Sequence, residues 1–527
     1  MQPSCIHQTE IPGTSKLFLD YLYRFDRVSS FYNWPFSEMS SFRNAAAQLQ
    51  YPEERRAKLV AALRRQNGHS AALERLADPR TVAVVTGQQV GFLSGPEFTV
   101  FKALTAVRLA EELNASGLPA VPIFWAASED HDLAEVDHAW VFDQHGKPEK
   151  ISLGNAVTNG GPVGNVVFNE MPMDAIRAAL GELPHTDAVI EKLQQWYRAG
   201  ATFAGAFLGF VKDLLKDFGI VFVDPLQPDI RDIAAPFLRE TVERVPELTS
   251  GLRKRNQELL DAGYHAQVVV DEDASLLFLL SDNKRTAVRW KDGRFVTRER
   301  SYSAQELAAE AGAGRISPNA LLRPVMQDYL LPSVSYVAGP SEIAYMAQGQ
   351  VLYEKLLGRM PVIFPRNSFT LLDARAAKLM DRFDITFPQL LHSQEQVKAV
   401  MACKLVPQNL TAEMESLQAS LRASLEKVQA DLSAFDATLA KAAQKSSAKI
   451  AYQVEKLARK TAREALRRDQ RAAKDAEYLI DIVYPHRHLQ ERFYSIVPFL
   501  AQHGWDLPQR IYENVQLSCP HHMTRVV

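Results

Sequence analysis

Two short polar segments each follow an apolar run, and both carry side chains that could do chemistry. The first, TGQQ, begins at Thr86 and contains Gln88 and Gln89, and the second is the EDHD cluster at residues 129–132. Glutamine amides both donate and accept hydrogen bonds, which suits a sugar or an amide better than a metal ion. Crowded carboxylates repel one another and raise a pKa, which is a common way to prepare a general base.

The EDHD cluster is the predicted catalytic centre. We expect Asp130, His131 and Asp132 to accept or transfer a proton, with Glu129 beside them binding substrate. The alternative is a solvated loop or a helix start, where acidic residues interact favourably with the helix dipole. No metal is predicted, because adjacent residues seldom converge on one ion.

The elements that would position these segments are those of a parallel α/β sheet. Residues 81–85 and 121–125 are apolar runs typical of buried strands, and residues 97–113 between them have helical spacing. Strand, helix and strand together form a βαβ unit, which joins parallel strands. Further buried strands are predicted at residues 219–223, 335–338 and 361–364.

Both polar segments follow predicted strands, so they should lie at the carboxyl edge of the sheet, where open parallel sheets bind ligands. Gly95 lets the backbone approach a ligand closely, and the helix after Pro96 presents free N–H groups to a phosphate or carboxylate. We predict that Thr86, the two glutamines, Gly95 and Lys102 bind substrate there.

A third polar segment, GPSEIAYMAQ, follows the predicted strand at residues 335–338. Its i, i+3 and i+6 spacing is interpreted as placing Glu342, Tyr345 and Gln348 on one helix face, where they would bind sugar hydroxyls or an ammonium group. Helix–helix packing is the alternative for that face. We expect all three polar segments to surround one anionic or polyhydroxy ligand.

The region from 408 to 484 contains neither glycine nor proline and carries a heptad-like apolar seam with one stutter. Residues 408–440 are acidic overall and residues 441–480 are basic. Two oppositely charged arms joined by the small polar stretch AAQKSSAK favour an antiparallel hairpin, and one straight helix is the alternative. The seam would otherwise leave an apolar stripe in water, so we predict a homodimer through this region.

The chain is divided into four predicted regions by these patterns. They are a helical lead-in (1–80), a core (81–385) built from 81–150 and 330–385 with modules inserted at about 151–329, a helical coiled coil (386–484), and a C-terminal segment packing on the core (485–527). Residues 266–299 of the insertion read as antiparallel hairpins with an Asp-Gly turn.

Composition excludes several classes of protein. Over 527 residues the formal net charge is -2, so there is no overall basic field for nucleic acid. The three cysteines, Cys5, Cys403 and Cys519, are far apart in sequence, which indicates a reducing compartment. Cys519 and His521 resemble half of a zinc site, but no second ligand pair lies nearby in sequence, which favours a surface tail. No apolar run is long enough to cross a membrane, and no signal peptide is visible, so a cytoplasmic location is predicted.

Four segments together resemble one protein family over nearly the whole chain. They are TGQQVGFLSGPEFTVFKA, VPIFWAASEDHDLAEVDH, LLRPVMQDYLLPSVSYVAGPSEIAYMAQ and YPHRHLQERFYSIVPFL. In this order they closely resemble the BshC family, the cysteine ligases of bacillithiol biosynthesis. The resemblance implies a Rossmann core with connecting-peptide insertions, as in class I aminoacyl-tRNA synthetases, and a coiled coil that pairs two subunits.

The synthetase motifs that handle ATP are altered in this chain. Gly95-Pro96 is kept, but the two histidines expected after it are absent, and the lysine-rich KMSKS loop is missing. Arg366, Asn367 and Ser368 lie about where that loop would fall. We therefore expect them to bind ATP or another nucleotide, with positive charge supplied by Lys102 and Arg366.

The resemblance implies a ligase that joins the carboxyl group of cysteine to the amine of glucosaminyl-malate, an amide-forming reaction and the last step of the pathway. Two alternatives remain open from the sequence. One is a synthetase-like protein that binds nucleic acid through the basic arm, and the other is a dimeric scaffold without catalysis. Interleaved acidic residues in the arm count against the first, and the retained polar strand ends count against the second.

Overall fold

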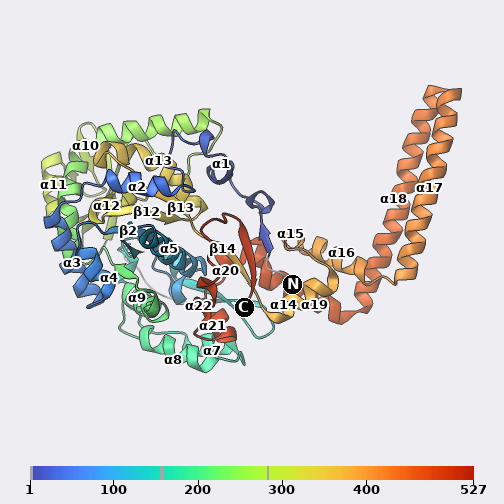
Figure 1. Cartoon of the computed structure of the whole chain (residues 1–527), viewed down its shortest axis with the longest axis horizontal. Coiled ribbons are helices and arrows are strands. Elements are labelled where there is room, and N and C mark those ends of the chain that lie inside the picture. Colours follow the sequence, from blue (N-terminus) through green and yellow to red (C-terminus); the bar gives the residue numbers. More distant parts are fainter. Residues whose placement is uncertain (1–3, 155–159, 282–283) are drawn as a thin grey trace.

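The computed structural model describes residues 4–154, 160–281 and 284–527. Within these residues the centre is a parallel sheet with the strand order β13-β12-β2-β3-β6 (Figure 1). Its strands are β2 (Val82–Gln89), β3 (Ala120–Ala127), β6 (Val221–Val223), β12 (Ser333–Ala338) and β13 (Val362–Pro365). Each predicted buried strand is therefore confirmed, and the α/β fold class with it.

The sheet is buried on both faces, as its continuous apolar strands require. Neighbouring residues of β3 show this, because Phe124 packs into one hydrophobic cluster and Trp125 into the other. Both side chains are fully buried. The order of the strands reverses between β2 and β12, where helices α5 (Phe98–Ala115) and α13 (Pro340–Leu357) begin. The carboxyl edge at this point is therefore the expected ligand position.

Helices before the sheet form the N-terminal part of the core (Figure 1). They are α1 (Lys16–Tyr23), α2 (Met39–Ala47), α3 (Glu53–Asn67) and α4 (Ala71–Ala77). Their apolar residues join the same cluster as Trp125. This helical lead-in therefore packs directly on one face of the sheet.

The first insertion lies between β3 and β6. Its elements are α6 (Leu133–Val136), β4 (His138–Phe142), β5 (Pro148–Ser152), α7 (Met173–Leu180), α8 (Thr186–Trp196) and α9 (Phe203–Leu214). Their apolar residues pack into the cluster that contains Phe124, on the opposite face of the sheet from the lead-in.

The second insertion lies between β6 and β12. Its elements are α10 (Pro228–Asp261), β7 (Ala274–Ser281), β8 (Lys284–Lys291), β9 (Arg294–Val296), β10 (Ser301–Tyr302), α11 (Ala304–Gly312), β11 (Ile316–Pro318) and α12 (Arg323–Leu330). The predicted antiparallel hairpins are confirmed by β7, β8 and β9. Asp292 and Gly293 both have positive φ (48° and 78°), as a tight hairpin turn needs. Residues 282–283, between β7 and β8 in sequence, lie outside the described residues.

After the parallel sheet, the chain forms a small second sheet that includes both of its ends. The strand order is β1-β15-β14, with β1 (Ser4–Ile6), β14 (Ser368–Leu372) and β15 (His522–Val526). The chain between β14 and β15 also forms the helices α14 (Ala374–Phe383), α15 (Phe387–Leu390), α16 (Gln394–Lys404), α19 (Gln470–Val483), α20 (Gln490–Phe493), α21 (Val497–His503) and α22 (Leu507–Tyr512). Of these, α14, α19 and α20 contact β14, whereas α21 packs against α8 and α22 against α5.

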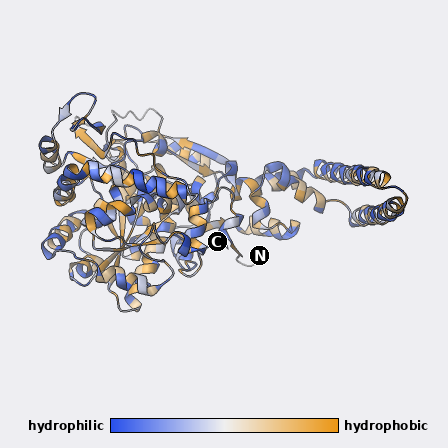
Figure 2. Ribbon diagram, turned by 90° about the horizontal axis from the view of Figure 1, so that it is seen from above, coloured by the Kyte–Doolittle hydropathy of each residue, from blue (hydrophilic) through white to orange (hydrophobic). Residues whose placement is uncertain are grey.

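Two long helices, α17 (Gln408–Phe435) and α18 (Ala437–Arg468), project from this part of the molecule as an antiparallel hairpin (Figures 1 and 2). The chain reverses at Asp436, whose carboxylate accepts hydrogen bonds from the N–H groups of Thr438 and Leu439. The expected linker AAQKSSAK lies instead inside α18. Its alanines, lysines and glutamine are good helix formers, whereas an aspartate at an N-cap begins a new helix.

Candidate functional site

A cavity of about 520 Å³ opens at the carboxyl edge of the sheet, where the strand order reverses. All three polar segments identified in the sequence contribute to its wall, through Gln88 and Gln89, through Glu129 to His131, and through Glu342 and Tyr345. The inserted β-sheet and the C-terminal segment close it with Arg285 and Arg492. The expected convergence of the three segments on one cavity therefore agrees with the structure.

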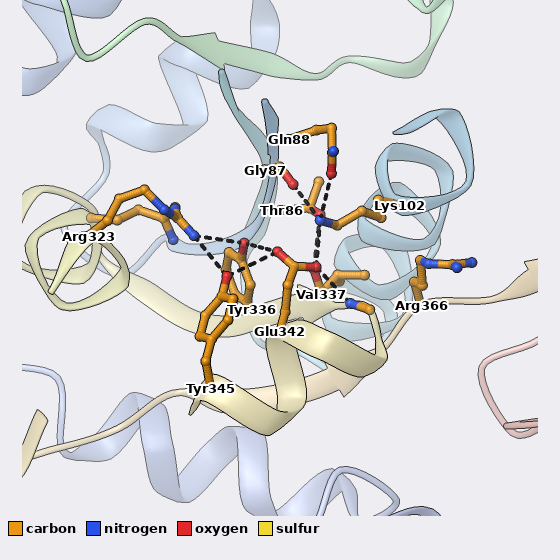
Figure 3. Close-up of polar contacts among 12 residues, drawn as sticks. Thr86, Gly87, Gln88, Lys102, Arg323, Tyr336, Val337, Glu342, Tyr345 and Arg366 are labelled. Carbon is orange, nitrogen blue, oxygen red and sulfur yellow. Dashed lines mark hydrogen bonds and ion pairs between the residues drawn. The ribbon is translucent and has the colours of Figure 1, made fainter. Parts of the chain in front are cut away.

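The centre of the cavity wall is a buried ion pair between Lys102 and Glu342 (Figure 3). The Nζ atom of Lys102 lies 2.6 Å from Oε2 of Glu342, and it also donates to the carbonyl oxygen of Gly87. Burial lowers the pKa of the Lys102 ammonium, and Glu342 opposes that shift. Burial acts to raise the pKa of the Glu342 carboxyl, but Lys102 and the N–H of Gly339 hold that pKa below its ordinary value. The two side chains therefore satisfy each other as a buried ion pair.

The second oxygen of Glu342 organises a group of hydroxyls around Arg323 (Figure 3). Oε1 of Glu342 accepts a 2.7 Å hydrogen bond from the hydroxyl of Tyr336, and Arg323 donates to the hydroxyl of Tyr345 at 3.1 Å. Arg323 also donates to the side-chain oxygen of Gln327 at 3.1 Å. The Arg323 guanidinium thus lines the cavity and, among the described residues, is hydrogen-bonded only to neutral side chains. Tyr345 beside it is held in place for a hydrogen bond to a ligand hydroxyl.

The acidic end of the cavity is built from the EDHD cluster. Glu129 is buried and paired with Arg231 at 2.9 Å, and burial raises the pKa of its carboxyl despite that partner. Asp130 differs, because it accepts a 2.6 Å hydrogen bond from Gln89 and another from the N–H of His131. Burial acts to raise the pKa of Asp130, but the side chain of His131, the Gln89 amide, the N–H of His131 and the charge of Arg285 hold that pKa well below its ordinary value. Asp130 therefore stays a carboxylate and is a weak base.

His131 is tied to the same arginine. Nη1 of Arg285 lies 2.8 Å from Nδ1 of His131, and a guanidinium can only donate, so Nδ1 accepts. A neutral His131 then carries its proton on Nε2 and has no free lone pair. The expected general base is thus occupied in this arrangement. Asp132, expected beside it, does not line the cavity, because its carboxylate caps α6 through the N–H of Glu135.

The opposite end of the cavity is cationic. Arg366 forms a two-pronged pair with Glu491, at 2.8 and 2.6 Å, and both side chains are buried. Arg492 lies on the same wall, with its guanidinium 5.9 Å from the ring centre of Phe98. Burial and the nearby Arg366 lower the pKa of Arg492. Within the described ranges no residue forms a hydrogen bond or an ion pair with its guanidinium. Its charge is therefore available to a ligand.

Other predicted site residues lie behind the wall and hold the elements together. Thr86 donates to the carbonyl of Val337 on β12, and Gly95 has a positive φ of 67° that the turn before α5 requires. Asn367 bonds to the backbone at Gln516, and Ser368 bonds to Glu491 and His522. Arg366 is thus the only one of the three expected nucleotide-binding residues on the described wall of this cavity.

Gln348 also lies away from the cavity, contrary to its expected position beside Glu342. Its amide bonds to Asn256 and to the backbone of Val268. The reason is geometric, because each step of three residues advances about 300° around a helix, and two steps leave i+6 about 120° away from i. The i, i+3 pair of Glu342 and Tyr345 does share the cavity wall.

Arg285, Arg323 and Arg492 were not among the residues predicted from sequence. Two of them, Arg323 and Arg492, lie in segments that carried the family resemblance, LLRPVMQDY and HLQERFY, and an arginine next to an apolar or aromatic residue in such a segment was the available signal. Within the described part of the chain, no three His, Cys, Asp or Glu side chains are grouped as a metal site. No helix among these residues is long and apolar enough to span a membrane.

Comparisons with known proteins agree across the whole chain. Residues 1–367 match the family model described as "Bacillithiol biosynthesis BshC, N-terminal Rossmann-like domain", and residues 369–524 match the corresponding "C-terminal coiled-coil domain". A protein of Solibacter usitatus named "Putative cysteine ligase BshC" is 49% identical over 527 residues, covering 100% of both chains. Relatives with the same name from Koribacter versatilis and Salinibacter ruber are 36% and 30% identical, covering 99% and 93% of this chain and 99% and 92% of theirs.

Proposed function

The chain belongs to the BshC family of bacillithiol biosynthesis, and we propose that it is the cysteine ligase that joins the carboxyl group of cysteine to the amine of glucosaminyl-malate. The observation that carries this proposal is the cavity at the sheet edge, which has a carboxylate at one end and an uncommitted arginine at the other. Such a cavity fits a substrate that carries an amine and carboxylates at its two ends.

The cationic end would hold the malate carboxylates of the substrate. The Arg492 guanidinium forms no hydrogen bond or ion pair with the described residues, and the first turn of α13, at Pro340 and Ser341, lies on the same wall. A guanidinium binds a carboxylate through two parallel hydrogen bonds, and the start of a helix favours negative charge. Lys102 was expected to have this role, but its charge is already neutralised by Glu342.

The acidic end would hold the amine. Asp130 stays ionised and is partly open to the cavity, so it attracts the ammonium form of the glucosamine nitrogen. An ammonium has no lone pair, so it must lose a proton before it can attack a carboxyl carbon. His131 can accept that proton only if the Arg285 hydrogen bond to Nδ1 shifts, and water beside Asp130 is the other acceptor. Tyr345 and Arg323 would bind sugar hydroxyls between the two ends.

Amide formation from a free carboxyl group needs an activating partner, and we propose ATP or another nucleotide. When bound, it would supply the leaving group that makes the cysteine carboxyl reactive. Arg366 lies on the wall of the cavity at the sheet edge and of a second cavity of about 440 Å³, and it would meet a phosphate there. Glu491 neutralises its charge, so this contact would use the N–H groups of the guanidinium that Glu491 leaves free. The residues expected beside it, Asn367 and Ser368, support its loop.

The hairpin of α17 and α18 would pair two copies of the chain. No residue of α17 is buried, and large apolar side chains are exposed along both helices. These include Leu417, Phe435, Leu439 and Leu457. We therefore propose a homodimer through the hairpin. We also place the protein in the cytoplasm, because its three cysteines are free thiols.

Neither alternative function is favoured. Basic residues on α18 pair with acidic neighbours, as Arg459 does with Glu455 at 3.6 Å and Arg467 with Glu464 at 2.7 Å. Their charge is therefore partly neutralised along the arm that would have to follow a nucleic acid backbone. A scaffold without catalysis would have no need of the buried, charged cavity.

The test is to incubate the pure protein with cysteine, glucosaminyl-malate and ATP, and to measure the thiol product by mass. We expect Arg492→Ala to raise KM for glucosaminyl-malate about 10- to 100-fold, the loss of one charge-assisted hydrogen-bonding group. Arg492→Lys should recover part of that loss, and Arg298→Ala, at an exposed position outside the cavity, should have no effect. An unchanged KM for glucosaminyl-malate, or a rise confined to ATP, would contradict the assignment of the cationic end.

A further inference from the structure

Two thiols from opposite ends of the sequence lie side by side on the surface. The Sγ atoms of Cys5 and Cys519 are 3.7 Å apart. Cys5 is exposed and Cys519 is half-buried, whereas the third cysteine, Cys403, is in α16. The proposed reaction at the sheet edge uses neither thiol of this pair.

Ordered contacts hold the two thiols together. β1 pairs with β15 in an antiparallel register that places Ser4 opposite Thr524 and Ile6 opposite His522. The Gln8 amide donates to the carbonyl of Pro520 at 3.2 Å, one residue after Cys519. The proximity is therefore built into the pairing of the chain ends.

The sequence suggested half of a zinc site at Cys519 and His521, and the structure brings Cys5 and His7 to that position. His7 and His521 have ring centres 5.2 Å apart, with Tyr23 stacked on His7 at 3.9 Å. The Nδ1 atom of His521 is occupied by the hydroxyl of Tyr23 at 3.0 Å. No metal-ligand group of three is formed by the side chains that the structure describes. The arrangement is thus a pair of thiols beside aromatic rings.

We propose that Cys5 and Cys519 are a redox modification site, which low-molecular-weight disulfides convert to an intramolecular disulfide. The thiolate of Cys5 attacks one sulfur of the external disulfide, forms a mixed disulfide and releases one small thiolate. The thiolate of Cys519 then attacks the Cys5 sulfur, closes the internal disulfide and releases the second small thiolate. The protein loses two electrons and two protons, and the external disulfide gains both to become two thiols.

The order of the two attacks follows from accessibility. Cys5 is exposed, so it meets the external disulfide first. Burial raises the pKa of the Cys519 thiol, which makes this residue the second, resolving thiol. A disulfide requires the two sulfur atoms at about 2.05 Å, so rotation of these side chains must close the present gap.

The bond would act on a cavity next to the candidate site. The segment directly after β1, from Gln8 to Ser15, forms one wall of the second cavity, and Arg366 and Arg492 lie on the boundary that it shares with the first. Fixing β1 to the C-terminal segment would restrain that wall. The oxidation state of the thiol pair would thus be transmitted to the space around the two arginines.

The identity of a natural oxidant rests on the proposed function, since the product of a bacillithiol-forming enzyme is itself a thiol, and its disulfide belongs to the required class. The proposal that Cys5 and Cys519 form a disulfide does not depend on the proposed function. The test therefore uses bis(2-hydroxyethyl) disulfide, which resembles no substrate of the proposed reaction. Failure of the crosslink and failure of the ligase assay are then distinguishable.

The reduced full-length protein would be treated with this disulfide, alkylated and digested, and its peptides identified by mass. We expect a crosslinked peptide containing Cys5 and Cys519, formed equally in Cys403→Ser. Cys5→Ser and Cys519→Ser should instead stop at a mixed disulfide with hydroxyethanethiol. Mixed disulfides at both positions of the wild-type protein without a crosslink, or reaction at Cys403 alone, would overturn the proposal.

Hydrogen exchange would test the effect on the second cavity. Amides of residues 8–15 should exchange several-fold more slowly in the oxidised wild-type protein than in the reduced one. The same treatment of Cys5→Ser should leave that exchange unchanged. Equal exchange in the oxidised and reduced wild-type proteins would overturn the inferred link between the thiol pair and the cavity wall.

Discussion

The cavity at the sheet edge and the projecting hairpin are both rich in opposite charges, but the charges are used differently. The Lys102–Glu342 and Arg366–Glu491 pairs have side chains no more than 17% exposed. On the hairpin, both partners of the Arg467–Glu464 pair are more than 40% exposed. A charge removed from water is costly without its partner, whereas an exposed pair is screened by solvent. Burial therefore decides whether the loss of one partner of an ion pair changes the stability of the fold strongly or hardly at all.

The largest expected effect is in the cavity. Glu342→Ala would leave the Lys102 ammonium, which is 1% exposed, without its counter-ion. We expect the free energy of unfolding to fall by about 3–5 kcal/mol, as for other broken buried pairs. Unfolding in urea, followed by circular dichroism, would measure it.

A double variant separates the cost of an unpaired charge from the value of the pair. Replacing both residues by apolar ones, as Lys102→Met with Glu342→Leu, removes both charges at similar volume. Stability should then return close to that of the wild-type protein, whereas ligase activity should not return. If the double variant were as unstable as Glu342→Ala, the loss would come from packing or from the tyrosine hydroxyls and not from the charge of Lys102.

A smaller effect concerns pH. His522 is fully buried between Ser368 and Thr370, and burial lowers the pKa of its imidazole to about 4. The unfolded chain binds this proton at about pH 6.5, so the stabilisation by neutral His522 is present above that pH and is lost as pH falls toward 4. The loss should reach roughly 3 kcal/mol at the acid end of this window.

Urea unfolding at several pH values would measure this slope in the wild-type protein and in His522→Asn. The slope should be shallower in the variant but not zero, because the pKa of His503 is also lowered to about 4, mainly by burial. Equal slopes in the two proteins would show that His522 is not the group that titrates.

Shortening the hairpin should change assembly without changing the stability of the core. A short glycine-serine linker in place of residues 416–456 removes equal lengths on either side of the turn at Asp436, and it leaves the buried Ala462 in place. Sedimentation should show a monomer for the shortened protein and a dimer for the full chain, and the urea midpoint should be unchanged. A shortened protein that still sediments as a dimer would place the interface in the core.

The smallest effect is expected for an exposed pair on the hairpin. Arg467 and Arg468 hold the pKa of the Glu464 carboxyl at about 2, but all three side chains are open to solvent. Glu464→Ala should therefore leave the urea midpoint within the scatter of repeated measurements. A clear loss of stability would show that this part of the hairpin is covered in the assembled protein.

Much of the sheet was predictable from sequence, because buried parallel strands leave a local signal. Runs such as those of β2 and β3 are apolar, short and followed by polar residues or glycine. The position of the three polar segments followed from the rule that ligands bind where the strand order reverses. The turn at Asp436 was missed because one aspartate among good helix formers is a weak signal beside a longer polar stretch.

The partners of the site residues were less predictable, since they come from distant segments. Lys102 looks like a free cation in sequence, and only the fold places Glu342 on it, 240 residues later. From the sequence His131 looks like a free base, but in the fold Arg285 of the inserted sheet donates a hydrogen bond to its Nδ1 atom. Spacing identifies which side chains share a local surface, but it does not identify what that surface meets.

The small sheet that joins β1 to β15 has a consequence for synthesis on the ribosome. β15 lies between β1 and β14, so neither of these strands can pair with its neighbour until residues 522–526 have been made. Until then, β1 and β14 would have unpaired backbone N–H and C=O groups, which is a known route to aggregation. A nascent chain released before residue 522 would lack the strand that pairs with both β1 and β14. Such products should be recognised by chaperones and proteases more readily than chains that lack the tip of the hairpin.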